Sequence, residues 1–194
     1  MEKENESKVK EAQVDYNRYY TYADYVKWDD DTRWELIDGT PYAMSAPLRR
    51  HQKISIRLIE HLLSFLNDKP CEVYHAPFDV RLNADTKDDT VVQPDIVVIC
   101  DPAKLTDAGC DGSPDMVIEI LSPSTSNYDR ITKFNKYREH GVREYWIVDP
   151  ESSYLAVHIL KGEDFATYAY SAESTVPVHI LDDCVIDLTK VFEA

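Results

Sequence analysis

The chain has 194 residues, of which 43% are apolar and 29% are charged, as is usual for a single globular domain with a substantial core. Its 36 acidic residues outnumber its 21 basic residues, and the formal charge of −15 excludes a protein that coats nucleic acid through the phosphate backbone alone. A nuclease is not excluded, because a metal site needs local acidic residues and a substrate groove needs only local basic ones.

The N-terminal residues 1–20 begin with M-E-K-E-N-E-S-K-V-K-E, which contains no hydrophobic signal core. We expect this charged segment to be flexible, and residues 21–194 to form one domain. No apolar run in the chain approaches the ~20 residues of a membrane span. We therefore expect a cytoplasmic protein with no membrane partner.

The four cysteines show no metal-binding or redox pattern. None of them forms a C-x-x-C pair, and no Cys or His spacing is typical of zinc ligands. We interpret them as reduced thiols of a cytosolic protein, in preference to a disulfide or a zinc site. The cysteines are Cys71, Cys100, Cys110 and Cys184.

In the first half of the chain, the dipeptide Asp38-Gly39 is a strong hairpin signal between two short apolar segments. A longer helix is predicted next, because apolar residues recur there at helical spacing. The predicted elements are a helix over 21–28, strands over 33–37 and 42–45, a helix over 47–66, and strands over 72–82 and 91–100.

The second half of the chain predicts a strand, a helix and a second strand, followed by a hairpin. A loop or short helical insertion over 101–113 precedes this unit. The predicted elements are strands over 116–121 and 144–148, a helix over 126–140, a hairpin of 154–160 with 165–170, a strand over 178–181 and a helix over 188–192. This order predicts an α/β (α+β) fold in which helices cover a mixed central sheet, with a hairpin at each end of the chain.

Two carboxylates lie within or beside apolar, β-branched strands. Asp95 follows Pro94 at the start of one strand, and Glu119 interrupts another. Acidic residues are rarely buried unless they are paired or bind a metal. If the two strands are neighbours, both carboxylates can meet at one edge of the sheet, where the Ile120 carbonyl could add a third oxygen. Oxygen ligands of this kind suit Mg²⁺.

The helix that follows the Glu119 strand carries two lysines on one face. Lys133 and Lys136 are three residues apart, and Tyr137 lies one turn after Lys133. Because this helix must fold back across the sheet, a long lysine side chain can reach the carboxylates. A lysine there can orient a water molecule and stabilise developing charge.

The residues from Pro94 to Pro150 resemble a known family. Asp95, Glu119-Ile120-Leu121 and the segment V-I-E-I-L-S-P-S-T-S…D-R…K…Y…G-V-x-E-Y-W-I-V-D-P are similar to the Uma-two restriction-endonuclease family, within the PD-(D/E)XK restriction-endonuclease-like superfamily. The W-E-L-I-D-G hairpin and the helix near His51 match it more weakly. Leu121 occupies the position where the superfamily pattern has lysine.

The resemblance implies a restriction-endonuclease-like fold and a metal-dependent endonuclease that hydrolyses DNA phosphodiester bonds with metal-activated water. It implies that Glu35, Asp95 and Glu119, with the carbonyl of Ile120, hold Mg²⁺, for which Mn²⁺ could substitute. It also implies that the missing lysine is supplied by Lys133. A homodimer is expected by analogy, with the hairpin at 154–170 as a candidate interface.

Each candidate residue also has a structural alternative. Asp95 could cap a turn after proline, Glu119 could belong to a buried ion pair, and Lys133 could lie on a solvated helix face. Glu35 could face solvent, and a polar role at a helix start is favoured for His51. At the level of the molecule, the alternative is a non-catalytic protein of the same fold that binds nucleic acid or a protein partner.

Overall fold

The structure is a computed structural model that describes residues 14–123 and 126–193. Most of the N-terminal segment expected to be flexible, residues 1–13, lies outside the described residues. Within residues 14–20, Tyr20 is 5% exposed, and its amide donates to the Gly39 carbonyl over 2.9 Å. This last part of the segment therefore packs against the first hairpin.

A six-stranded central sheet organises the molecule, with strand order β12-β11-β10-β9-β6-β3. Strands β9 and β10 are parallel, whereas the other neighbours are antiparallel, so the sheet is mixed as predicted. These strands are β3 (Glu72–His75), β6 (Ile96–Ile99), β9 (Met116–Ile120), β10 (Glu144–Asp149), β11 (Tyr154–Lys161) and β12 (Asp164–Ser171).

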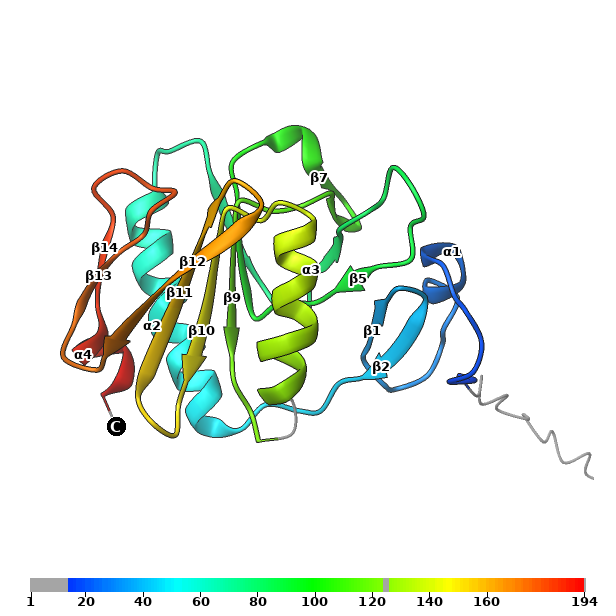
Figure 1. The fold of residues 1–194 in the computed structure, drawn as a ribbon, viewed down its shortest axis with the longest axis horizontal. Helices are drawn as coiled ribbons and strands as arrows, with labels where there is room; N and C mark the ends of the chain where they lie inside the picture. Colours follow the sequence, from blue (N-terminus) through cyan, green and yellow to red (C-terminus); the bar gives the residue numbers. More distant parts are fainter. Residues whose placement is uncertain (1–13, 124–125, 194) are drawn as a thin grey trace, which may run out of the picture.

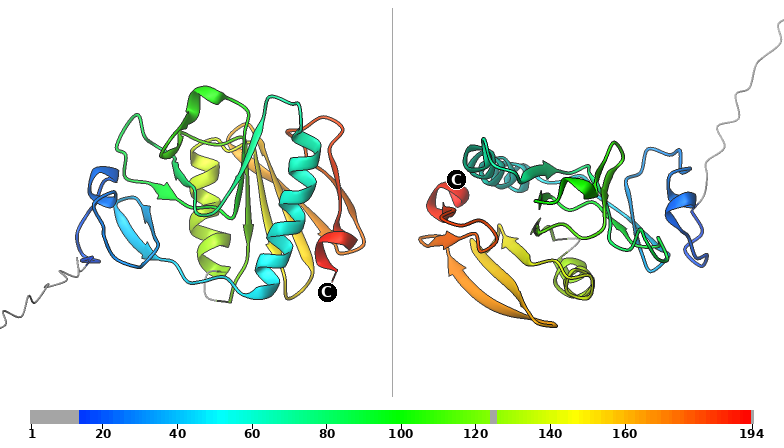
Figure 2. Two further views of the ribbon diagram at one scale, coloured as in Figure 1. Left: turned by 180° about the vertical axis from the view of Figure 1, so that it is seen from behind. Right: turned by 90° about the horizontal axis from the view of Figure 1, so that it is seen from above.

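Helices cover both faces of this sheet, as Figures 1 and 2 show. The long helix α2 (Arg49–Leu66) packs on one face through its regularly spaced apolar residues Ile54, Leu58 and Leu62. The helix α3 (Phe134–Glu139) covers the opposite face, where Tyr137 lies in the core. The fold is therefore the mixed α+β arrangement predicted from the order of elements.

A second, smaller sheet lies beside the central one and contains the N-terminal hairpin (Figure 1). Its strand order is β2-β1-β5-β4-β8-β7. The hairpin turns at Asp38-Gly39 as predicted, and both residues have positive φ. The strands are β1 (Trp34–Ile37), β2 (Thr40–Ala43), β4 (Asp79–Arg81), β5 (Val91–Val92), β7 (Leu105–Thr106) and β8 (Gly109–Asp111).

Two segments predicted as single strands are each divided between the two sheets. Residues 72–82 form β3 and β4, separated by a cis peptide bond between Ala76 and Pro77, and residues 91–100 form β5 and β6. The prediction of continuous strands was wrong, because an apolar run does not reveal that the chain leaves one sheet and enters another. The two divisions bring the small sheet beside the central one, and residues of both sheets share one apolar core.

The region of the predicted helix over 126–140 contains two helical forms. A π-helix, η2 (Tyr128–Lys133), continues directly into α3. π-Helical turns are rare and occur frequently at functional sites.

The remaining elements lie near the two ends of the chain, apart from one short 3₁₀ helix near its middle. The C-terminal hairpin β11–β12 and the last helix are confirmed, but the strand predicted over 178–181 is wrong, because the strands lie on either side of it. These elements are α1 (Tyr22–Tyr25), the 3₁₀ helix η1 (Pro102–Lys104), β13 (Thr175–Pro177), β14 (Val185–Asp187) and α4 (Leu188–Phe192).

The prediction that all cysteines are reduced is also wrong. Cys71 and Cys100 form a disulfide, whereas Cys110 and Cys184 are free and buried. Cys71 precedes β3 and Cys100 follows β6. Because these strands are antiparallel neighbours, the two cysteines lie opposite each other with Cα atoms 4.0 Å apart. A separation of 29 residues gives no sign of this pairing.

No helix within the described residues combines the length and the apolar character that crossing a membrane would require.

Candidate active site

Glu35 is brought into the interior by the N-terminal hairpin. It lies on β1 and is only 1% exposed, so the alternative in which it faces solvent does not hold. The backbone amide of Gln93 donates to its Oε1 over 2.7 Å. Because Gln93 lies between β5 and β6, this hydrogen bond connects the hairpin to the segment that precedes β6 and carries Asp95.

Asp95 and Glu119 come from neighbouring strands, the arrangement that lets their carboxylates meet at one edge of the sheet. The pairing of β6 with β9 ends at Ile96 opposite Ile118, so Asp95 lies just beyond the ladder, beside the end of β9. Its Oδ2 accepts the Ile120 amide over 2.7 Å. The amide and carbonyl of a residue in an extended strand point to the same side, so the Ile120 carbonyl is also directed towards β6.

Glu119 projects from the face of the central sheet that α3 covers. Val117 and Leu121, two residues to either side on the strand, belong to the apolar core on that face, as the alternation of side chains along a strand requires. Glu119 is 4% exposed, and the Tyr137 hydroxyl donates to its Oε1 over 2.8 Å. Helix α3 therefore supplies a hydrogen-bond donor that orients this carboxylate.

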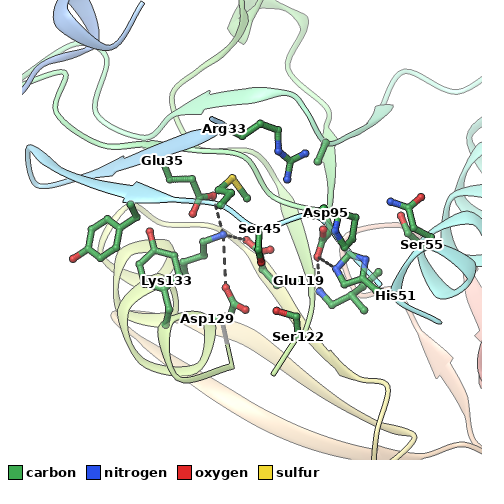
Figure 3. A pocket seen from close by; sticks show the side chains of 18 of the residues that line it. Arg33, Glu35, Ser45, His51, Ser55, Asp95, Glu119, Ser122, Asp129 and Lys133 are labelled. Carbon is green, nitrogen blue, oxygen red and sulfur yellow. Dashed lines mark hydrogen bonds and ion pairs between the residues drawn. The ribbon is translucent and has the colours of Figure 1, made fainter. Parts of the chain in front are cut away.

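Lys133 lies at the centre of the acidic residues (Figure 3). Its Nζ is 2.8 Å from Oε1 of Glu35, 2.9 Å from Oε1 of Glu119 and 3.7 Å from Oδ1 of Asp129. The lysine side chain is only 2% exposed, so the alternative of a solvated helix face does not hold. The π-helix thus ends with its lysine directed into the space between β1 and β9.

Burial and neighbouring charges shift the pKa values of this cluster in opposite directions. Burial alone would lower the pKa of Lys133, but the carboxylates of Glu119 and Glu35 outweigh it and hold the pKa well above its ordinary value. Burial raises the pKa of Glu119, against the opposing effect of the Lys133 ammonium. We therefore treat Lys133 as a permanent cation on which the buried carboxyl groups depend.

Some contacts of the site were not part of the sequence prediction. His51 Nε2 lies 3.1 Å from Oδ2 of Asp95, so the histidine at the start of α2 contacts a candidate metal ligand. Asp129 joins the Lys133 cluster, and the i, i+4 spacing of these two residues was a usable signal. Lys136, the second lysine considered, pairs elsewhere, with Asp38 and Glu139.

These side chains line a pocket of about 400 Å³, within the usual range for ligand sites. Asp95, Glu119, Glu35 and Lys133 all contribute to its wall. Figure 3 shows the pocket between the N-terminal hairpin, the start of α2 and the ends of β6 and β9. The structure therefore brings the four predicted catalytic residues to one cavity.

A divalent metal ion could be held on one side of this pocket. Among the described residues, no three His, Cys, Asp or Glu side chains are arranged to hold one ion together. Mg²⁺ nevertheless needs only one or two carboxylates, with water and substrate oxygens completing its shell. Asp95, Glu119 and the Ile120 carbonyl fit this requirement. Glu35 contacts Lys133, and its role as a further ligand stays a prediction.

One solved structure is similar to this chain in fold, and two curated proteins are similar to it in sequence. The crystal structure titled as a "putative nuclease belonging to DUF820" from Anabaena variabilis ATCC 29413 aligns with a TM-score of 0.73 at 18% identity, covering 89% of this chain and 97% of that one. This likeness shows the restriction-endonuclease-like fold.

Two uncharacterized proteins of Synechocystis sp. (strain ATCC 27184 / PCC 6803 / Kazusa) are also similar. One is 32% identical over 132 residues, which cover 66% of this chain and 68% of that protein. The other is 26% identical over 149 residues, which cover 74% of this chain and 82% of that protein. The model of the family described as "Uma2: Putative restriction endonuclease" matches residues 22–188, and the chain therefore belongs to this family.

Proposed function

We propose that the protein is a Mg²⁺-dependent endonuclease that hydrolyses phosphodiester bonds of DNA. The observation that carries this proposal is the pairing of two strand carboxylates with a buried lysine. Asp95 and Glu119 lie at the adjoining ends of β6 and β9, and the Lys133 ammonium is 2.9 Å from Glu119.

In this proposal Asp95, Glu119 and the Ile120 carbonyl hold Mg²⁺ or Mn²⁺. The bound ion would supply Lewis acidity and lower the pKa of a coordinated water molecule. Lys133 would donate a hydrogen bond to the attacking water and orient it. Glu35 and the Tyr137 hydroxyl hold the lysine and Glu119 in place, which preserves this geometry.

The test is hydrolysis of plasmid and linear DNA with Mg²⁺ or Mn²⁺. Asp95→Ala and Glu119→Ala should each lower the rate by more than about a hundredfold, the order of loss when one group of such a site is removed. Glu60→Ala is the matched control, because Glu60 is an exposed acid on α2, outside the pocket. Cleavage that survives both site substitutions would contradict the proposal.

The second candidate is a non-catalytic protein of the same fold that binds nucleic acid or a protein. It is favoured by Leu121 at the superfamily's usual lysine position, and by the lack of a three-ligand group among the described residues. Calorimetric titration with Mg²⁺ separates the two candidates. Binding that disappears in Glu119→Ala supports the nuclease, whereas no binding by a folded protein supports the second candidate.

A further inference from the structure

The pocket presents one arginine, Arg33, that has no ion-pair partner among the described residues. Arg33, one residue before β1, lines the pocket together with the four acidic residues Glu35, Asp95, Glu119 and Asp129. Within the described residues it has neither an ion pair nor a side-chain hydrogen bond. It is also partly buried, so it is not simply a solvated surface residue.

Arg33 differs in this respect from the other partly buried arginines in the described part of the chain. Each of the partly buried ones has an acidic partner: Arg81 pairs with Asp88 and Asp111, Arg57 with Glu60, and Arg138 with Asp164. In a chain with 36 acidic and 21 basic residues, acidic partners are abundant. An unpaired, partly buried guanidinium at a pocket therefore points to an anion that comes from outside the protein.

The backbone explains why Arg33 is directed to the same place as Glu35. The Met44 amide donates to the Arg33 carbonyl over 2.8 Å, which extends the pairing of β1 with β2 by one residue. Side chains two residues apart on an extended strand share a face. Figure 3 shows the Arg33 guanidinium over the pocket, on the side where Asp95 and His51 lie.

Two other basic side chains of the pocket already contact acidic residues. Lys133 already contacts Glu35 and Glu119, and His51 contacts Asp95. A phosphodiester that approaches the pocket meets four acidic residues, so besides the proposed metal ion it needs a side-chain cation that is not already paired. The guanidinium is planar, permanently charged and able to donate two hydrogen bonds to one phosphate.

We infer that Arg33 binds a phosphate group of the nucleic-acid strand and positions the reacting phosphodiester at Asp95 and Glu119. This inference rests on the proposed function for its ligand class. It assigns Arg33 a substrate-binding role, not a part in the bond-breaking step.

The test compares Arg33→Gln with Arg49→Gln. Arg49 is exposed at the start of α2, lies outside the pocket lining and also lacks an ion pair among the described residues, so the control makes the same change in charge. The binding probe is a fluorescein-labelled oligonucleotide, single-stranded or duplex, with Ca²⁺ or with EDTA, followed by anisotropy. Hydrolysis of the same oligonucleotide is measured with Mg²⁺.

Arg33→Gln should weaken binding by about tenfold to a hundredfold and raise KM while kcat changes little. The slope of log affinity against log salt should fall in magnitude by about one, as expected for one lost phosphate contact. Arg49→Gln should stay within about twofold of the wild type. Arg33→Lys keeps the charge without the planar donor pair, should give an intermediate effect, and serves as the test if Arg33→Gln does not fold.

Equal effects of the two glutamine substitutions, or a wild-type protein that binds no oligonucleotide, would overturn the inference. Binding that depends on Arg33 without any hydrolysis would support the inference and overturn the proposed nuclease. The two failures are therefore distinguishable.

Discussion

The acidic side chains of the site depend on the Lys133 ammonium for their compensating charge. It lies within 2.9 Å of two carboxylate oxygens, from Glu35 and Glu119, and all three side chains are at least nine-tenths buried. Removing one partner of a buried ion pair leaves an uncompensated charge, which costs far more than the pair itself contributes. The same arrangement therefore controls stability and the proposed chemistry.

Lys133→Met should lower the free energy of unfolding by about 3–5 kcal/mol, because two carboxylates would remain buried without a cation. Urea denaturation at pH 7 measures this change. Lys136→Met is the matched control, and its partly exposed ion pairs predict a loss of less than about 1 kcal/mol. Equal losses in the two variants would show that Lys133 does not hold the cluster together.

His158, on β11, is a buried titratable residue that does not line the pocket. Its Nδ1 bonds with the Thr167 hydroxyl, its Nε2 has no partner among the described residues, and burial lowers its pKa to about 4. The unfolded chain protonates His158 near pH 6.5, whereas the folded protein resists protonation until about pH 4. Its contribution to stability is therefore intact above pH 6.5 and is lost as the pH falls from 6.5 towards 4.

When the pH is lowered from 8 to 5, protonation linked to His158 should lower the free energy of unfolding by about 2 kcal/mol. In His158→Gln, which cannot titrate, that part of the pH dependence should disappear from urea denaturation curves. His75→Gln changes an exposed histidine and should keep the wild-type pH dependence. An unchanged pH dependence in His158→Gln would show that this histidine is not the group responsible.

At the level of elements, the first hairpin and the π-helix determine where the site forms. The hairpin carries Glu35 and Arg33, and its turn requires positive φ at Asp38 and Gly39. The π-helix delivers Lys133 and Asp129 to the opposite wall. Neither element contains Asp95 or Glu119, so the site depends on docking of separate elements.

Gly39→Ala should destabilise the hairpin by more than about 1 kcal/mol. Gly39 has a φ of +74°, and an added Cβ would overlap the Tyr19 ring. Gly162 has a φ of +66° with open space around the added carbon, so Gly162→Ala should show only the smaller cost of the backbone. Thermal and urea denaturation compare the two, and an equal loss would mean that the Tyr19 contact has no effect.

At the level of the whole molecule, the disulfide joins two strands of the central sheet. β6 begins one residue after Asp95 and ends one residue before Cys100, so the disulfide is anchored to the strand that follows the candidate ligand.

Hairpin β11–β12 leaves β12 at the edge of the central sheet. A homodimer expected by analogy could form through this edge, and sedimentation of the purified protein would test it.

Replacing both bonded cysteines, as Cys71→Ser with Cys100→Ser, should cost about 3–4 kcal/mol of unfolding free energy, as the entropy of a 29-residue loop predicts. Alkylation of the denatured, unreduced protein followed by mass spectrometry should label only Cys110 and Cys184. Labelling of all four cysteines would contradict the disulfide.

The sequence by itself predicted most of the helices and strands and indicated the candidate residues of the site. Local apolar periodicity predicts α2, the Asp38-Gly39 pair predicts the hairpin, and the acidic residues in β-branched runs indicate Asp95 and Glu119. These signals are local, because they depend on the repeat of a helix or strand and on the cost of burying a carboxylate.

Only the tertiary structure decided which groups meet. The pairing of Cys71 with Cys100, the division of 72–82 and 91–100 between two sheets, and the contact of His51 with Asp95 all depend on the docking of separate elements. The ion pair of Lys133 with Glu35 joins residues almost a hundred positions apart. No spacing along the chain encodes such contacts, because they arise when burial of apolar faces brings the hairpin, the sheet and the π-helix together.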